Sequence, residues 1–139
     1  MMAVAVCSVI LSMPVRDYHH SMATCLHVAS YAQTHEQPIH LMVSLSYMES
    51  RLTWDAVSPK GALGPMQVMP YWVVKNRDKA LAGIYAWKYW RRRSITDRVA
   101  VAKYNAGYKP GRKSFDFANK VMKLSNRIHG FVGGVVNAD

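Results

Sequence analysis

Hydrophobic residues recur at helical spacing over most of this 139-residue chain, and no long stretch alternates between apolar and polar residues with a period of two. Turn-forming Gly, Pro, Ser and Asp residues separate the helical stretches from one another. Helices are expected at about residues 17–34, 38–52, 65–74, 78–90, 94–107 and 114–128. The pattern predicts a mostly α fold with little or no β structure, and the length fits one compact domain.

The second expected helix carries a stripe of residues that ends in a carboxylic acid. Met42, Leu45, Ser46 and Glu49 stand at positions i, i+3, i+4 and i+7, so they share one helix face. Glu49 therefore lies at the C-terminal end of a core-facing stripe, where burial and the helix dipole both raise a carboxyl pKa. A general acid needs such a raised pKa. A buried, hydrogen-bonded acid without a catalytic role shows the same pattern.

The first fifteen residues contain no charged side chain and are rich in Val, Ile, Leu and Met. This segment is shorter than the about 20 apolar residues with which a helix crosses a bilayer. It also lacks the basic start and the Ala-x-Ala site of a signal peptide. Residues 1–15 are expected to form an apolar arm that packs on the domain or on a partner. The domain itself is expected at 16–128, followed by a glycine-containing tail at 129–139.

The chain is strongly basic, with 18 Lys and Arg against 8 Asp and Glu and a formal net charge of +10. Such a charge favours polyanionic partners: nucleic acid, anionic lipid, or a cell wall rich in carboxylate and phosphate. Cys7 and Cys25 form neither a disulfide framework nor a metal-ligand spacing, and they are expected to be buried free thiols. No pair of the six histidines forms a zinc motif, so no metal is expected.

Among the eight carboxylates, Glu49 is the only one embedded in an apolar helix face next to a glycine-rich loop. Most glycosidases use two carboxylic acids at the bond that they break. Asp55 is the candidate for the second, but an Asp in such a loop more often caps a turn. Asp97 is expected at a helix N-terminus, where it forms a capping pattern with Ser94. A mechanism with a single acid is therefore expected.

Four sequence blocks follow one another in a fixed order. They are Glu49-Ser50, Ala-Val-Ser-Pro-Lys-Gly-Ala at 56–62, Gly-Pro-Met-Gln-Val-Met-Pro at 64–70, and Tyr-Asn-Ala-Gly at 104–107. In this order they resemble the soluble lytic transglycosylases, lysozyme-like enzymes that cut the glycan strands of bacterial peptidoglycan. The resemblance covers residues 18–125, and four ordered blocks are far more specific than any one of them.

The resemblance implies a lysozyme-like α fold that uses no metal and no cofactor. It implies that Glu49 is the single acid/base and that the MurNAc-GlcNAc β-1,4 bond is cleaved with formation of 1,6-anhydro-N-acetylmuramic acid. In that reaction the substrate's own 6-hydroxyl is the nucleophile; muramidase-type hydrolysis is the alternative chemistry. The substrate-binding residues that it implies are Ser58, Gly64, Met66, Gln67, Tyr104, Asn105 and Phe117.

The chain departs from the family pattern at several positions. Pro65 stands where the family usually has Leu, and Tyr71-Trp72-Val73 replaces a stretch of small residues, which puts aromatic rings near the groove. Phe117 stands where the family usually has Tyr, so a hydroxyl near the acid is expected to be lost. The segment from 70 to 104 is shorter than usual, which predicts a more open groove.

Three functions are compatible with these observations. The leading one is a peptidoglycan lytic transglycosylase carried by a phage virion and acting in the host periplasm or cell wall, with residues 1–15 packed against other virion proteins. A bacterial periplasmic enzyme is the alternative context. The second function is a non-catalytic, lysozyme-fold structural or glycan-binding module, which Phe117 favours. The third is a module that binds DNA or membrane. Two features favour it: the net charge, and the cluster of Trp87, Trp90 and Arg91–Arg93.

Overall fold

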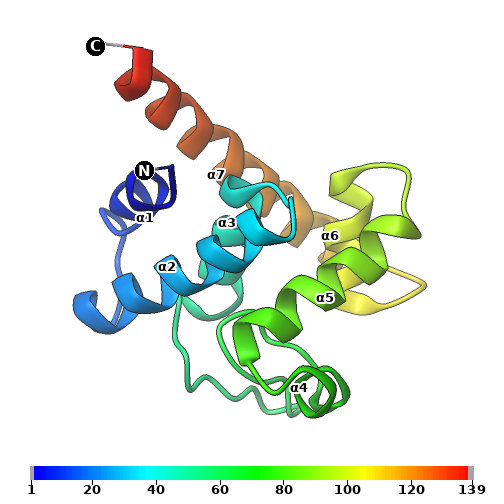
Figure 1. The fold of residues 1–139 in the computed structure, drawn as a ribbon. Helices are drawn as coiled ribbons and strands as arrows, with labels where there is room; N and C mark the ends of the chain where they lie inside the picture. Colours follow the sequence, from blue (N-terminus) through cyan, green and yellow to red (C-terminus); the bar gives the residue numbers. More distant parts are fainter. Residues whose placement is uncertain (1, 138–139) are drawn as a thin grey trace.

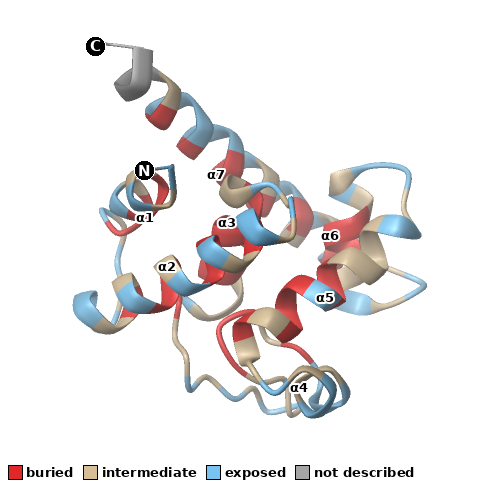
Figure 2. Ribbon diagram, in the orientation of Figure 1, coloured by how far each residue is buried: buried red, intermediate tan, exposed pale blue. Residues whose placement is uncertain are grey.

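Helix α3 (Ile39–Ser50) lies in the middle of the molecule, and three other helices pack around it (Figure 1). These are α1 (Met2–Ile10), α2 (Tyr18–Thr34) and α7 (Arg112–Asn137). Every residue of α3 from Leu41 to Tyr47 is buried (Figure 2). A helix that is buried all round needs apolar or small side chains on every face, and the run Leu-Met-Val-Ser-Leu-Ser-Tyr supplies them.

The computed structural model describes residues 2–137, and the side chains of residues 2–133. The remaining helices are α4 (Pro70–Asn76), α5 (Lys79–Arg92) and α6 (Asp97–Ala106), which form the other half of the fold (Figure 1). Within the described residues the only β pairing is two isolated bridges, Val57 with Leu63 and Leu63 with Val68. The prediction of a mostly α fold is confirmed.

Three helices begin at a side chain that accepts a hydrogen bond from a main-chain N–H of the first turn. Asp17 caps α2, Asp78 caps α5 and Thr96 caps α6. The capping prediction for Ser94 and Asp97 is wrong by two residues, because the Thr96 hydroxyl does the capping. Asp97 lies in the first turn instead, where the helix dipole favours an acid.

Two predicted boundaries are wrong. The short helix begins at Pro70 and not at 65, because Gly64 and Gln67 both have positive φ (77° and 51°) and form a turn. The last helix begins at Arg112 and continues to Asn137, so the expected glycine-containing tail is helical up to that residue; positions 138–139 lie outside the described residues. Leu124, Ile128 and Val132 continue one buried stripe at a spacing of four, which explains why the helix goes on past Gly130.

The two cysteines form a disulfide that joins α1 to α2, with an S–S distance of 2.09 Å and Cα atoms 5.8 Å apart. The prediction of buried thiols was right about burial and wrong about the free thiol. The pairing depends on the packing of α1 against α2, which the sequence separation of 18 does not reveal.

The apolar arm is part of the core. Val6, Ile10 and Leu11 are buried among residues of the central helices. The segment after α1 is also tied to α3, since the Pro14 carbonyl accepts hydrogen bonds from the Tyr47 hydroxyl (2.8 Å) and the Arg51 guanidinium (3.1 Å). Packing on the domain, one of the two alternatives expected for residues 1–15, is thus observed for these residues, and contact with another protein stays a prediction.

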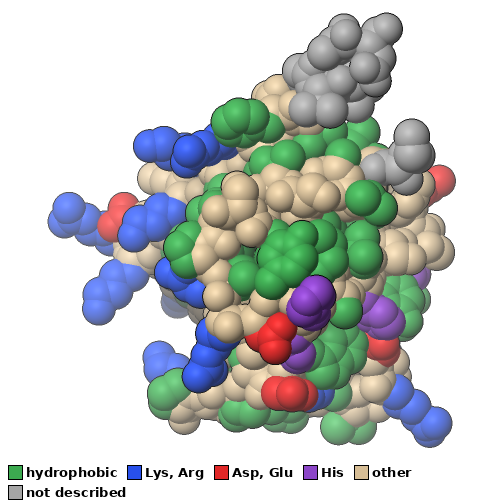
Figure 3. Space-filling model, turned by 90° about the vertical axis from the view of Figure 1, so that its left-hand side faces the viewer, with side chains coloured by type: hydrophobic (Ala, Val, Ile, Leu, Met, Phe, Trp, Pro, Cys, Tyr) green, Lys and Arg blue, Asp and Glu red, His purple; other side chains and the backbone are tan. Residues whose placement is uncertain are grey.

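Most Lys and Arg side chains on one face of the molecule lie along a single edge. In the view from the side of α1 and the start of α2, they project at the left, hydrophobic side chains occupy the middle, and histidines lie below, next to Asp or Glu side chains (Figure 3). Among the described residues, no helix has both the length and the apolar run needed to span a bilayer.

Candidate active site

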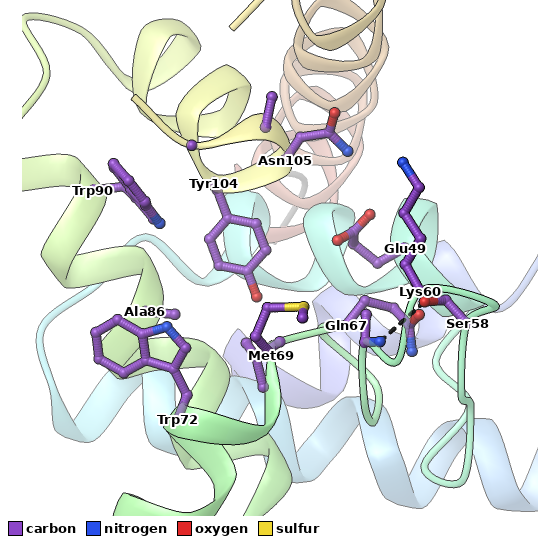
Figure 4. Close-up of a pocket in the computed structure, with 14 residues that line it drawn as sticks. Glu49, Ser58, Lys60, Gln67, Met69, Trp72, Ala86, Trp90, Tyr104 and Asn105 are labelled. Atoms are coloured by element: carbon purple, nitrogen blue, oxygen red, sulfur yellow. Dashed lines mark hydrogen bonds between the residues drawn. The ribbon is translucent and has the colours of Figure 1, made fainter. Parts of the chain in front are cut away.

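A pocket of about 600 Å³ opens between the C-terminal end of α3, the loop that follows it, and helices α4, α5 and α6. Glu49, Ser58, Gln67, Tyr104 and Asn105 all line this pocket (Figure 4). Residues that are up to 56 positions apart in the sequence are thus brought together around one carboxylic acid (Glu49 to Asn105). Their contact with a substrate stays a prediction.

Glu49 is the penultimate residue of α3 and extends from the buried helix into the pocket. Burial raises the pKa of its carboxyl from the ordinary 4.5 to about 8. The acid is therefore mostly protonated at neutral pH. A protonated carboxyl at the wall of an open pocket can donate a proton to a bound ligand.

The end of α3 is fastened to the loop by two serine hydroxyls. Ser50 and Ser46 both donate to the Pro65 carbonyl, at 2.7 Å and 2.9 Å. The Ser50 hydroxyl also accepts from the Thr53 N–H (3.1 Å). Ser50, which directly follows the acid, therefore fixes the loop against the helix turn that carries Glu49.

The loop itself is held by hydrogen bonds between its own residues. Ser58 and Ala62 pair, since the Ser58 N–H donates to the Ala62 carbonyl and the Ala62 N–H donates to the Ser58 hydroxyl, each at 3.0 Å. The Gln67 amide nitrogen donates to the carbonyls of Ala56 (3.1 Å) and Gly64 (2.9 Å). These bonds hold the loop in the conformation described, in which Ser58 and Gln67 lie at the pocket wall.

Tyr104 and Asn105 come from the last turns of α6. The Tyr104 hydroxyl donates to the Met66 carbonyl (2.6 Å), which connects α6 to the loop. Burial and, secondly, the charge of nearby Glu49 raise the pKa of this hydroxyl well above 10, so it stays protonated and keeps donating. The Asn105 side-chain oxygen accepts from the Ser114 hydroxyl (2.9 Å), which orients its amide beside the pocket.

Three predicted site residues do not line the pocket. Gly64 is buried in the loop, where an added Cβ would come within 2.8 Å of the Lys79 Cβ. Met66 is fully buried, because its side chain packs against Gly83 of α5; a Cβ at Gly83 would lie 2.3 Å from the Met66 sulfur. Met66 thus reaches the site through its carbonyl alone. Phe117 is half-buried and packs against the core from α7.

The sequence interpretation missed several pocket residues. Lys60, Met69 and Trp90 line the pocket. Trp87, three residues earlier, is the core residue: it is fully buried, and its ring N–H donates to Gln37. The spacing of Trp87 and Trp90 places them on one helix face. It does not show that Trp87 packs in the core and that Trp90 lies at the pocket. The aromatic replacement at Trp72 was the available signal, and Trp72 does line the pocket.

Asp55 lies outside the pocket lining. Its side chain is 80% exposed, and its nearest cation is the Lys79 ammonium at 4.0 Å. This position favours the turn interpretation over a second catalytic carboxylate. Within the described part of the chain, no group of three or more His, Cys, Asp or Glu side chains could hold a metal ion.

Comparison of the chain with protein-family models, with curated proteins and with solved structures finds no match in any of the three. No family membership follows from them. The functional interpretation therefore depends on the pocket and on the four sequence blocks that surround it.

Proposed function

We propose that this protein is a peptidoglycan lytic transglycosylase in which Glu49 is the single acid/base. The observation that carries the proposal is the convergence of the four sequence blocks on one pocket, around a carboxyl whose pKa burial raises to about 8. The blocks contribute Glu49, Ser58, Gln67, and Tyr104 with Asn105.

The reaction needs one proton donor that later accepts a proton. Protonated Glu49 gives its proton to the glycosidic oxygen as the bond from C1 of N-acetylmuramic acid to that oxygen breaks. The 6-hydroxyl of the same sugar then attacks C1, and the Glu49 carboxylate takes the hydroxyl proton. One C–O bond is broken and one is formed, no water is consumed, and Glu49 ends protonated as it began.

The rest of the pocket is suited to holding the sugar. Gln67 and Asn105 carry amides and Ser58 a hydroxyl at the pocket wall. Such groups can orient the N-acetyl and hydroxyl groups of a glycan and stabilise charge that develops at C1. The hydrogen bonds from Ser46 and Ser50 to Pro65 limit the movement of the loop relative to Glu49, which catalysis by positioning requires.

The proposed place of action is the periplasm or cell wall, reached with a phage particle or by bacterial export. The Cys7–Cys25 disulfide supports this placement, because disulfides persist in oxidising compartments. The net charge of +10 supports it too, since it attracts the protein to an anionic wall.

The test is mass spectrometry of purified peptidoglycan after digestion by the parent protein, Glu49→Gln and Asp55→Asn. We expect products ending in 1,6-anhydro-N-acetylmuramic acid from the parent and Asp55→Asn. Glu49→Gln should keep the fold and lose at least about a hundredfold in rate, the contribution of a positioned acid/base.

Two outcomes would contradict parts of the proposal. Reducing-end products would indicate hydrolysis instead of transglycosylation. Release of muropeptides by Glu49→Gln at the parent rate would remove Glu49 from the mechanism. Binding to wall material without any product from the parent would favour the non-catalytic glycan-binding module.

A further inference from the structure

Four aromatic side chains form a continuous group along one side of the pocket. They are Trp72 of α4, Tyr89 and Trp90 of α5, and Tyr108 in the loop after α6, called here the aromatic wall. Ring centroids are 5.6 Å apart for Trp72 and Tyr89, and 4.9 Å apart for both Tyr89–Trp90 and Trp90–Tyr108, all in edge-to-face contact. Trp72 and Trp90 line the pocket itself.

The aromatic wall is held in place by the structure behind it. Trp72 packs on a small cluster of Val68, Ala82 and Ala86. The Arg93 guanidinium lies 3.7 Å from the centroid of the Tyr89 ring and donates to the Tyr89 carbonyl (3.0 Å). Tyr89 and Tyr108 are hydrogen-bonded through their hydroxyls. Rings that are already ordered lose little entropy when a ligand binds.

None of the four rings is part of the buried core. Trp72, Tyr89 and Trp90 are half-buried, and Tyr108 is 64% exposed. By contrast, Trp87, which lies on α5 with Tyr89 and Trp90, is fully buried. A group of partly exposed large aromatic side chains beside a pocket, and not scattered singly, marks a binding surface.

We propose that the aromatic wall is a sugar-stacking subsite for a β-1,4-linked N-acetylhexosamine glycan. The apolar C–H face of a pyranose ring would lie on the indoles of Trp72 and Trp90, while its hydroxyls point to the rim. The two tryptophans lie on the opposite side of the pocket from Glu49, Ser58 and Lys60, with Tyr104 and Met69 between (Figure 4). The subsite therefore holds sugars to one side of the acid and lengthens the glycan that the protein recognises.

This inference rests on the proposed function for the identity of the ligand, but its test measures binding alone. A single-stranded nucleic acid also stacks on aromatic side chains next to cations. The glycan is favoured because the same pocket presents the amides of Gln67 and Asn105 and the protonated Glu49, which suit uncharged hydroxyl and N-acetyl groups.

The experiment is a titration of the Glu49→Gln protein, which should not cleave, with the β-1,4-linked tetramer of N-acetylglucosamine. Binding is measured by calorimetry and by tryptophan fluorescence. Adding Trp72→Ala or Trp90→Ala should weaken binding about tenfold or more, since each removes a large aromatic contact. Trp90→Phe keeps a flat ring and should recover part of the affinity. Tyr85→Ala is the matched control, because Tyr85 is an exposed aromatic of α5 outside the pocket lining, and it should change affinity less than twofold.

The outcomes separate this inference from the proposed function. If both tryptophan variants keep their thermal unfolding transition and bind the tetramer like the control, the aromatic wall is not a sugar subsite, whatever the parent cleaves. Tryptophan-dependent binding of the tetramer alongside a parent that yields no peptidoglycan product would support the subsite and overturn the enzyme. Tryptophan-dependent, salt-sensitive binding of a single-stranded DNA 12-mer, without tetramer binding, would overturn the glycan assignment.

Discussion

The two sides of the pocket are built by different forces. The acid side, formed by the end of α3 and the loop to Gln67, is held by hydrogen bonds of 2.7–3.1 Å in which Ser46, Ser50 and Gln67 donate to main-chain carbonyls. The aromatic wall is held chiefly by ring contacts and a cation over Tyr89, with hydrogen bonds only from Arg93 to the Tyr89 carbonyl and between the Tyr89 and Tyr108 hydroxyls. Directional bonds hold a reacting group in one place, whereas stacked rings offer area to a ligand that need not be aligned to a fraction of an ångström. Changes on the acid side should therefore alter kcat, and changes in the wall should alter KM.

A change in pH should produce the largest difference between the two sides of the pocket, because it should alter cleavage and leave glycan binding nearly unchanged. The pKa of Glu49 is about 8, so the acid is present below that pH and is lost as pH rises through it. We expect kcat/KM for peptidoglycan to fall about tenfold per pH unit above pH 8. Binding of the N-acetylglucosamine tetramer to the wall should change little over the same range. Cleavage that increases through pH 8, or binding that falls in parallel with it, would contradict the division.

A smaller effect should follow from removing the disulfide by Cys7→Ser with Cys25→Ser. Opening a cross-link that closes a loop of 18 residues should lower the free energy of unfolding by about 3 kcal/mol. Urea titration measures this change, and the reduced parent is the matched control.

The closed loop includes Pro14, whose carbonyl binds Tyr47 and Arg51 on either side of Glu49. Any fall in activity should therefore appear in kcat, while the double variant binds the tetramer as before. An unchanged urea midpoint would show that α1 needs no cross-link.

The smallest effect should come from Phe117→Tyr. The Phe117 side chain packs against the core from α7 and is not among the residues that line the pocket. We expect the variant to hold or slightly raise activity, with a change below about twofold, as for substitutions away from a site. Peptidoglycan digestion at substrate saturation measures it. A large loss would mean that the ring supports the acid side from behind.

Helix positions were predictable where the signal is local. The helix at Tyr18–Thr34 follows from seventeen residues without Pro or Gly. The end of α7 was not predictable in the same way, because Gly130 suggests a stop. Continuation depends on Ile128 and Val132 finding the core, which is a tertiary contact. The disulfide was missed for the same reason.

The same contrast between local sequence signals and tertiary contacts applies to the residues of the candidate site. Glu49, Ser58, Gln67, Tyr104 and Asn105 were selected from sequence blocks, and the structure brings them to one pocket. The resemblance implied that Met66 lines the groove beside Gln67, but the Met66 side chain is fully buried against Gly83 of α5. Whether Trp90 faces the core or the pocket depends on how α5 is rotated against α4 and α6. The spacing of residues within α5 does not determine that rotation.

The contact between Gly83 and Met66 has a consequence for sequence evolution. Any side chain at position 83 would overlap the methionine, since a Cβ there would lie 2.3 Å from its sulfur. Among relatives of this chain, position 83 should accept a larger residue only where position 66 has become smaller, so the two positions should vary together. A lineage with large residues at both would have moved α5 away from the loop, and its pocket would have a different shape.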